Sequence, residues 1–345
     1  MTDSAVPAPG SGSRIPVPGS RFPTLYLGID GGQTQTKAVI ADGTGRILGR
    51  GLGGPSNHVE APGGRDRLRR AVLDSAGGAL RAAGLGDLDT VTFAVVFCGM
   101  TGEADFKTEV ITPLFPGAIV RVEHDAPAAL AGATLGAPGI VVIAGTGSVV
   151  FGENAEGSVA RTGGWGYVFG DEGSGFGLAR DGVRAALDSL DDVGPPTRLV
   201  GSLTRRFGVE DLRLMPMAMY NGQISRDGVA EAVADVLEAW REDDDVATEV
   251  VTSGLDALAR RVRTVAARLQ LADPLVCLSG GVFRSVPYVA AFTVAVQRLI
   301  PTARVQPARL SPAAGAVLLA FRTAGIPVTD SMRDALVASA LEDRP

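Results

Sequence analysis

The chain has 345 residues, which is enough for about two domains of ordinary size. Hydrophobic residues make up 46% of it and charged residues 20%, as is typical of soluble globular proteins. The formal net charge of −6 argues against a large binding surface for nucleic acid or anionic membrane, so neither is expected as a partner. With two histidines and two cysteines, neither a His/Cys metal cluster nor a disulfide framework is expected.

Glycine is unusually frequent, with 46 residues, and this predicts many tight turns or close approaches of the backbone. No apolar run approaches the roughly 18 residues that span a bilayer, and no secretory signal is visible. A cytoplasmic protein is therefore expected. Residues 1–23 consist mainly of Pro, Gly, Ser and Ala and predict a disordered tail.

The chain from residue 24 to residue 124 predicts a first α/β lobe. Short apolar segments bounded by the turns GGQTQ and GTG favour strands, and apolar residues at helical spacing favour a helix between them. The expected strands cover residues 25–30, 36–42, 46–51, 91–99 and 118–125, and the clearest helix covers residues 65–83.

Residues 125–345 predict a second lobe that begins with the same order of elements. Strands are expected over residues 139–145, 149–154 and 158–164, again separated by glycine turns. Two such halves facing one another would leave a cleft lined by the turns, although glycine hairpins occur in many α/β proteins. The rest is mainly helical, and the acidic run Glu242–Asp245 is expected to be a solvated turn.

The first glycine turn follows Asp30 at the end of an apolar strand. Gly31 and Gly32 lack a Cβ, so their backbone N–H groups can point toward phosphate oxygens, and Thr34 adds a hydroxyl donor. Asp30 is placed to hold Mg²⁺ through water. The spacing of a Walker A loop is absent, and a plain β-hairpin with a polar turn remains an alternative.

Two further glycine turns follow apolar strands. Thr146, Gly147 and Ser148 come after GIVVIAG and have hydroxyl groups suited to a phosphate. Gly280 and Gly281 come after PLVCLS, where a flat ring could lie against bare backbone, or a helix could begin. The order of the three turns along the chain carries more weight than any one of them.

Asp125 ends a strand at the start of a helix of small residues. A carboxylate there could cap the helix, or it could take the proton from an attacking hydroxyl as a general base. The segment Gly163–Gly175 combines glycines, aromatic residues and a carboxylate pair. It is typical either of a wall that binds a polyol, with Trp165 against a sugar ring and Asp171 accepting from its hydroxyls, or of a capped helix.

Taken together, these motifs resemble the N-acetylglucosamine kinase branch of the sugar kinase/Hsp70/actin superfamily, from Leu25 to about Phe321. The segment GGWGYVFGDEGSGFGLAR, joined to HDAPAAL and VVIAGTGS, is a specific combination. The same family holds ATPases that activate acyl-CoA reductases and dehydratases. The resemblance implies an α/β protein with two ribonuclease-H-like lobes of actin-like ATPase fold, with ATP and Mg²⁺ between them.

The resemblance also implies a role for individual residues. Asp125 would be the general base for the 6-hydroxyl of the sugar, and Asp30 would hold Mg²⁺. The nucleotide would lie against Gly31, Gly32, Thr34, Thr146, Gly147, Gly280 and Gly281. The sugar would contact Asn57, Thr146, Ser148, Gly164, Trp165 and Asp171.

The expected function is ATP-dependent phosphorylation of an amino sugar, with N-acetylglucosamine as the first candidate. Gln33 stands where these kinases usually carry a third glycine, and residues 161–163 give no guidance on an N-acetyl pocket. Glucosamine, a muramic-type sugar and glucose are alternative substrates. An activator ATPase would need two exposed cysteines per subunit for a shared [4Fe–4S] cluster, and a sensor without catalysis is a third class. Family analogy implies a homodimer paired through the C-terminal helices.

Overall fold

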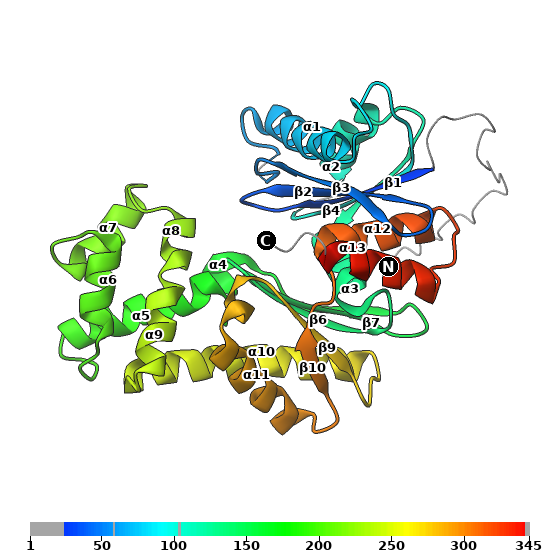
Figure 1. Ribbon diagram of the computed structural model, residues 1–345. Coiled ribbons are helices and arrows are strands. Elements are labelled where there is room, and N and C mark those ends of the chain that lie inside the picture. The colour runs from blue at the N-terminus through cyan, green and yellow to red at the C-terminus, as the bar shows by residue number, and fades with distance from the viewer. Residues whose placement is uncertain (1–23, 58, 103–104, 342–345) are drawn as a thin grey trace, which may run out of the picture.

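The computed structural model describes residues 24–57, 59–102 and 105–341, so the tail expected over residues 1–23 lies outside the described residues. The described chain forms two mixed five-stranded sheets, each covered by helices (Figure 1). The predicted α/β class with two lobes is confirmed.

The first sheet has the strand order β3-β2-β1-β4-β5. Strand β2 is antiparallel to its neighbours β1 and β3, and β4 and β5 run parallel to β1. Its strands are β1 (Leu25–Gly31), β2 (Thr36–Asp42), β3 (Ile47–Gly53), β4 (Phe93–Met100) and β5 (Ile119–His124). Because helices cover both faces, β1 is a nearly continuous buried run rather than an alternating one.

The second sheet repeats this topology in the order β10-β9-β6-β7-β8. Again three antiparallel strands come first, and β9 and β10 run parallel to β6. Its strands are β6 (Gly139–Ala144), β7 (Ser148–Glu153), β8 (Val159–Gly163), β9 (Leu275–Ser279) and β10 (Arg304–Pro307). The predicted duplication of element order is therefore confirmed at the level of the sheets.

Thirteen α-helices and three short 3₁₀ turns connect the strands of the described chain. The helices are α1 (Gly64–Ala82), α2 (Asp105–Ile111), α3 (Asp125–Thr134), α4 (Gly166–Phe169), α5 (Gly175–Leu190), α6 (Leu199–Phe207), α7 (Met215–Tyr220), α8 (Arg226–Glu231), α9 (Val233–Arg241), α10 (Asp245–Arg268), α11 (Val286–Leu299), α12 (Pro312–Thr323) and α13 (Asp330–Leu341). The 3₁₀ turns are η1 (Thr112–Leu114), η2 (Leu212–Leu214) and η3 (Gly281–Arg284).

Helix α3 lies between the two sheets and contributes to both hydrophobic cores. Ala128 and Ala131 pack with α12 against the first sheet, and Ala129 and Ala133 pack against the second. Helix α12 shares the face of the first sheet with α13, so the last helices of the chain cover its first strands (Figure 1). The division of the chain at residues 124 and 125 stays a prediction.

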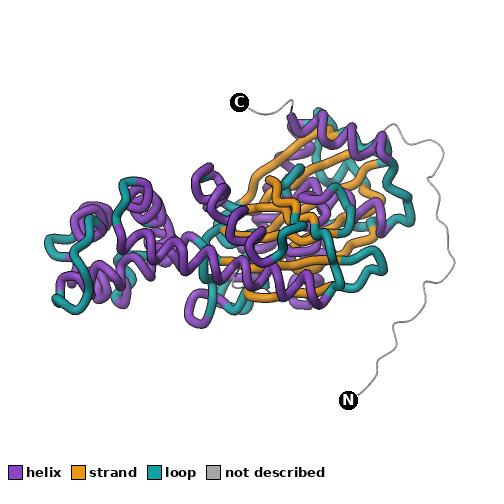
Figure 2. Tube along the Cα trace, turned by 90° about the horizontal axis from the view of Figure 1, so that it is seen from below, coloured by secondary structure: helices purple, strands orange, loops and turns teal. Residues whose placement is uncertain are grey.

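Helices α6 to α9 form a helical region that extends to one side of the second lobe (Figures 1 and 2). It joins α10, whose apolar residues recur every three or four positions and pack in the core of that lobe. The solvated turn expected at Glu242–Asp245 is wrong for Asp244. This buried carboxylate caps α10 by accepting from Ala247 N at 2.9 Å, and it also accepts from the Thr197 hydroxyl.

Candidate active site

A cavity of about 480 Å³ opens between the two lobes. Residues of the first glycine turn line one side of it, and residues of β6, β7 and the loop after β8 line the other. Of the predicted site residues, those that line this cavity are Asp30, Gly32, Thr34, Asp125, Thr146, Gly147, Ser148, Gly164 and Asp171. The fold thus brings together residues that are up to about 140 positions apart in the sequence.

The first glycine turn joins β1 to β2 and is fixed by backbone bonds. Gly32 N donates to Gln35 O at 3.0 Å, and Ser56 N donates to Gly32 O at 3.1 Å. At Gly31 a Cβ would lie 2.0 Å from the Met100 sulfur, so a larger residue there would require the Met100 side chain to move. The hairpin therefore holds the backbone of the turn at the cavity in one conformation.

Asp30 ends β1 beside the turn and opposite Lys37 in the ladder. Burial raises its pKa from 3.8 to about 6; the Asp125 carboxylate adds to the rise and Lys37 opposes it. A desolvated carboxylate beside a second one is a fitting place for a divalent cation, which would neutralise the pair. No group of three or more His, Cys, Asp or Glu side chains capable of holding a metal ion occurs among the described residues, so water would complete such a site.

Asp125 is the first helical residue of α3, and His124 occupies the N-cap position without a side-chain capping bond. The alternative that Asp125 caps this helix is therefore wrong. Its Oδ2 accepts a hydrogen bond of 2.9 Å from the Thr101 hydroxyl, and the carboxylate faces the cavity. A carboxylate held in this way at the N-terminus of a helix is oriented and stays available to a ligand.

The second glycine turn joins β6 to β7 and is held by Asp171. Oδ1 of Asp171 accepts from Ser148 N at 3.0 Å, and a Cβ at Gly147 would lie 2.8 Å from the same carboxylate. The Ser148 hydroxyl donates to Glu172 O at 2.9 Å. Asp171 adopts a left-handed conformation with φ of 63°, which its short polar side chain tolerates. The carboxylate therefore supports the second turn directly.

Five predicted site residues do not line the cavity: Gly31, Asn57, Trp165, Gly280 and Gly281. Trp165 precedes α4 and is 73% exposed, so its ring is free to meet a ligand. At Gly280, with φ of 111°, a Cβ would lie 2.3 Å from Ala144 O. This glycine lets the third turn approach the end of β6 beside the second glycine turn, while Gly281 opens η3 and has free space at its Cβ position.

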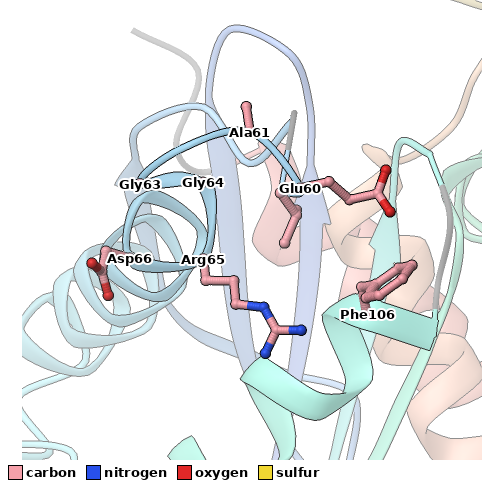
Figure 3. Close-up of a pocket in the computed structure, with 8 residues that line it drawn as sticks. Glu60, Ala61, Gly63, Gly64, Arg65, Asp66 and Phe106 are labelled. Carbon is pink, nitrogen blue, oxygen red and sulfur yellow. The ribbon is translucent and has the colours of Figure 1, made fainter.

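A second cavity of about 390 Å³ lies in the first lobe, between the loop before α1 and the start of α2. Figure 3 shows Glu60 and Phe106 on one side of it, while Asp66 points away. Arg65, which also lines it, forms an exposed ion pair with Glu109 at 3.2 Å. None of the predicted site residues in the described part of the chain lines this cavity, so the cavity between the lobes is the candidate site.

Two residues that the sequence analysis missed stand at the cavity between the lobes, Thr101 and Arg226. The carbonyl oxygen of Thr101 accepts from the buried ammonium group of Lys107, whose pKa is lowered by burial, with the Asp125 charge opposing that change. Arg226 comes from the helical region and pairs with Asp171 at 3.0 Å. Thr101 comes directly after the apolar strand β4 and before Gly102, so the pattern of a strand followed by a glycine turn could have pointed to it. Arg226 lies in no such turn, and no local signal pointed to it.

The two cysteines, Cys98 and Cys277, are buried in β4 and β9. Burial raises the pKa of both the Cys98 and the Cys277 thiol, which keeps them protonated and unreactive. No helix in the described chain is both long enough and apolar enough to cross a bilayer.

Comparison with known proteins shows which family the chain is similar to. The profile of the BadF/BadG/BcrA/BcrD ATPase family matches residues 27–320. An N-acetylmuramic acid/N-acetylglucosamine kinase from Clostridium acetobutylicum is 31% identical over 274 residues, which cover 76% of this chain and 87% of that relative. An N-acetyl-D-glucosamine kinase from Dictyostelium discoideum is 28% identical over 315 residues, or 87% of this chain and 98% of that relative.

A solved structure from Chromobacterium violaceum, provisionally named an N-acetylglucosamine kinase, superimposes with a TM-score of 0.70. It is 24% identical in sequence and covers 86% of this chain and 99% of its own. This likeness concerns the fold, and it shows the two-lobed architecture that the sequence resemblance implied.

Proposed function

The chain belongs to the BadF/BadG/BcrA/BcrD ATPase family. From that membership and from its similarity to relatives named as N-acetylglucosamine kinases, we propose that it transfers the γ-phosphoryl group of ATP to the 6-hydroxyl of N-acetylglucosamine. The observation that supports this proposal most is the position of Asp125. Its carboxylate faces the cavity between two glycine turns and is not used to cap its helix. A carboxylate in this position can take the proton from an attacking hydroxyl.

On the nucleotide side, Gly31 and Gly32 would let the backbone of the first turn border the phosphates, although the N–H of Gly32 is already bonded to Gln35 O. The N–H of Gly147 and the hydroxyls of Thr34 and Thr146, which line the cavity, would donate to the phosphate oxygens. The third turn, with Gly280 and Gly281, would border the nucleoside. Asp30 would hold Mg²⁺ through water, and the ion when bound neutralises charge on the phosphates. Most of the barrier reduction in such a transfer comes from positioning and from charge stabilisation rather than from covalent chemistry.

On the sugar side, Ser148, Gly164 and the exposed Trp165 ring would border the acceptor. Asn57, in the loop that follows β3, would reach the same sugar from the first lobe. Asp171 lies beneath this wall, where it fixes Ser148 N, and its contribution to sugar binding would therefore be largely through that support.

In the transfer step a bond forms between the sugar O6 and the γ-phosphorus, and the bond between that phosphorus and the β,γ-bridging oxygen breaks. Asp125 takes the proton of the 6-hydroxyl, and ADP leaves with the bridging oxygen. Proton transfer can be late in such a step, so Asp125 need only be ionised and correctly placed. The hydrogen bond from Thr101 holds the carboxylate in position.

Other acceptors fit the same reaction. The Clostridium acetobutylicum relative is named for both N-acetylmuramic acid and N-acetylglucosamine, so a muramic-type sugar is a second candidate, with glucosamine and glucose after it. The activator ATPase reading is disfavoured by the cysteines, because an interfacial cluster needs exposed thiolates and both thiols are buried. A homodimer paired through the C-terminal helices stays a prediction from family analogy.

The test is ADP release with Mg·ATP against N-acetylglucosamine, glucosamine, N-acetylmannosamine, muramic acid and glucose. Wild type, Asp125→Asn and the control Asp74→Asn, which changes an exposed carboxylate on α1, are assayed together. We expect sugar-dependent turnover that Asp125→Asn reduces by at least about 10²-fold, as for loss of a general base, while nucleotide binding persists. ATP hydrolysis that is indifferent to every sugar would refute the kinase, and near-wild-type rates in Asp125→Asn would refute its role as base.

A further inference from the structure

A chain of three contacts crosses the cavity from the first glycine turn to the second. Nη1 of Arg226 donates to Oε1 of Gln33 at 2.8 Å, and Nη2 donates to Oδ2 of Asp171 at 3.0 Å. The other oxygen of Asp171 accepts from Ser148 N at 3.0 Å. One guanidinium group therefore lies between the two turns that would surround the phosphates.

Arg226 is fixed in this position from several sides. It opens α8, and its guanidinium carbon lies 4.9 Å from the centre of the Tyr167 ring and 5.6 Å from that of Phe176. The Asp171 carboxylate is almost fully buried, with 4% of its side chain exposed, so the ion pair is shielded from water. The Arg226 side chain itself is 24% exposed and lines the cavity.

The hydrogen bonds of Arg226 are not all used. Its Nε–H is buried and has no acceptor among the described residues. Its bond to Gln33 has a neutral acceptor, an amide oxygen, and anionic phosphoryl oxygens bind a guanidinium more strongly than an amide oxygen does. The residue thus has a strong anchor on Asp171 and a weak partner at the tip of the first glycine turn.

On the proposed function, the phosphoryl group in transfer lies between this turn and Asp125, in the cavity that Gln33 and Arg226 also line. We propose that Arg226 is a catalytic residue that contacts the transferred phosphoryl group, exchanging its bond to Gln33 for a phosphoryl oxygen when ATP binds. The guanidinium then stabilises the charge on the equatorial oxygens during transfer. This step adds no bond-making beyond the transfer already described.

The test compares two nucleotides that differ by the γ-phosphoryl group. The dissociation constants of ADP and of the β,γ-imido analogue of ATP, both with Mg²⁺, are measured by calorimetry for wild type and Arg226→Gln. We expect the imido analogue to bind about tenfold more weakly to the variant, as for the loss of a charged hydrogen bond, and ADP to bind within about twofold of wild type. Equal weakening for both nucleotides, or for neither, would overturn the proposal.

Further variants separate a phosphoryl contact from a structural one. Arg226→Lys keeps the charge but not the fork of donors, so it should lose less affinity for the imido analogue than Arg226→Gln. Gln33→Gly removes only the competing acceptor, so it should bind the analogue at least as tightly as wild type. If Gln33→Gly instead reproduces the loss seen in Arg226→Gln, then Arg226 only ties the lobes together and the proposal fails.

The matched control is Arg206→Gln, which breaks an ion pair with Asp235 at 2.7 Å in the same helical region. It should leave both dissociation constants unchanged. If this control also weakened binding of the imido analogue and not of ADP, the result would count against the role of Arg226. Neither probe is a sugar. If Arg226→Gln selectively loses affinity for the imido analogue but the wild type turns over none of the sugars, the proposed acceptor is refuted and the assignment of Arg226 is kept. Absence of nucleotide binding to wild type would overturn both proposals.

Discussion

Gly315 of α12 lies against Gly132 of α3 where the two helices cross, and a Cβ at Gly315 would lie 2.3 Å from the backbone nitrogen of Gly132. The same Cβ would lie 2.0 Å from Ala128 O. Because both obstacles are backbone atoms, they cannot move aside as a side chain could. The crossing lies between the sheets of the two lobes, so its geometry bears on how the lobes sit around the cavity.

Gly315→Ala should therefore destabilise the protein by about 1 to 3 kcal/mol, as expected for overpacking in a core. The measurement is the free energy of unfolding from urea titration. Gly201→Ala is the matched control, since this exposed glycine in α6 would place its Cβ 3.4 Å from the end of the Arg205 side chain. The control should gain up to about 1 kcal/mol from helix propensity. Equal stability of the two variants would contradict the tight crossing.

Thr101→Val should lower kcat about tenfold, because it removes a hydrogen bond to a charged carboxylate while keeping the shape of the side chain. KM for ATP should stay within about twofold. Thr101→Ser, which keeps the hydroxyl, should retain most of the rate. If Thr101→Val retains the full kcat, or if the kcat of Thr101→Ser falls as far as that of Thr101→Val, then this hydroxyl does not orient Asp125.

Asp30 should make the folded protein less stable at neutral pH. A carboxyl whose folded pKa is about 6 and whose unfolded pKa is near 3.8 imposes no penalty below pH 4, where it is protonated in both states. The penalty develops between about pH 4 and pH 6 and reaches up to about 3 kcal/mol above that range. Asp30→Asn should thus raise Tm at pH 7.5 in the absence of nucleotide, and the gain should vanish near pH 4.

The ionised form of Asp30, which lowers stability, should at the same time be the form that the activity of the wild type requires. Below about pH 6 Asp30 becomes protonated and loses its charge toward Mg²⁺, so kcat/KM for Mg·ATP should fall there. Asp30→Asn should be poorly active at every pH. A variant that is both less stable and fully active at pH 7.5 would refute the assignment of Asp30 to the metal.

Trp165→Leu should raise KM for the sugar about three- to tenfold, the range expected for loss of one aromatic contact, and leave KM for ATP unchanged. Phe169→Leu is the control, because Phe169 is the last residue of α4, which Trp165 precedes, is 84% exposed and is not among the expected sugar contacts. Competition with unphosphorylatable 6-deoxy sugar would measure the same contact at equilibrium. An equal rise of KM in both variants would show that Trp165 has no specific role.

The sequence alone determined the α/β class, the repeated order of strands and turns, and the residues of the three glycine turns. These features depend on local physical chemistry: apolar runs of strand length must be buried, and turns without room for a Cβ need glycine. The local signals were insufficient at Asp244, expected in solvent and found as a buried cap, and at Asp125, where the capping alternative was still open. The position of Asp244 depended on its bonding partners, Ala247 N and the Thr197 hydroxyl, and that of Asp125 depended on the residue at which α3 begins.

Only the tertiary structure decided which polar groups meet at the cavity. Arg226 lies 193 residues from Gln33 and 55 from Asp171, and Thr101 lies 24 residues from Asp125. Nothing in the spacing of these residues along the chain reveals such contacts, because they depend on where α3 and the helical region pack against the sheets. Sequence patterns record the environment of each segment, whereas the pairing of charges across a cleft is set by the packing of whole elements.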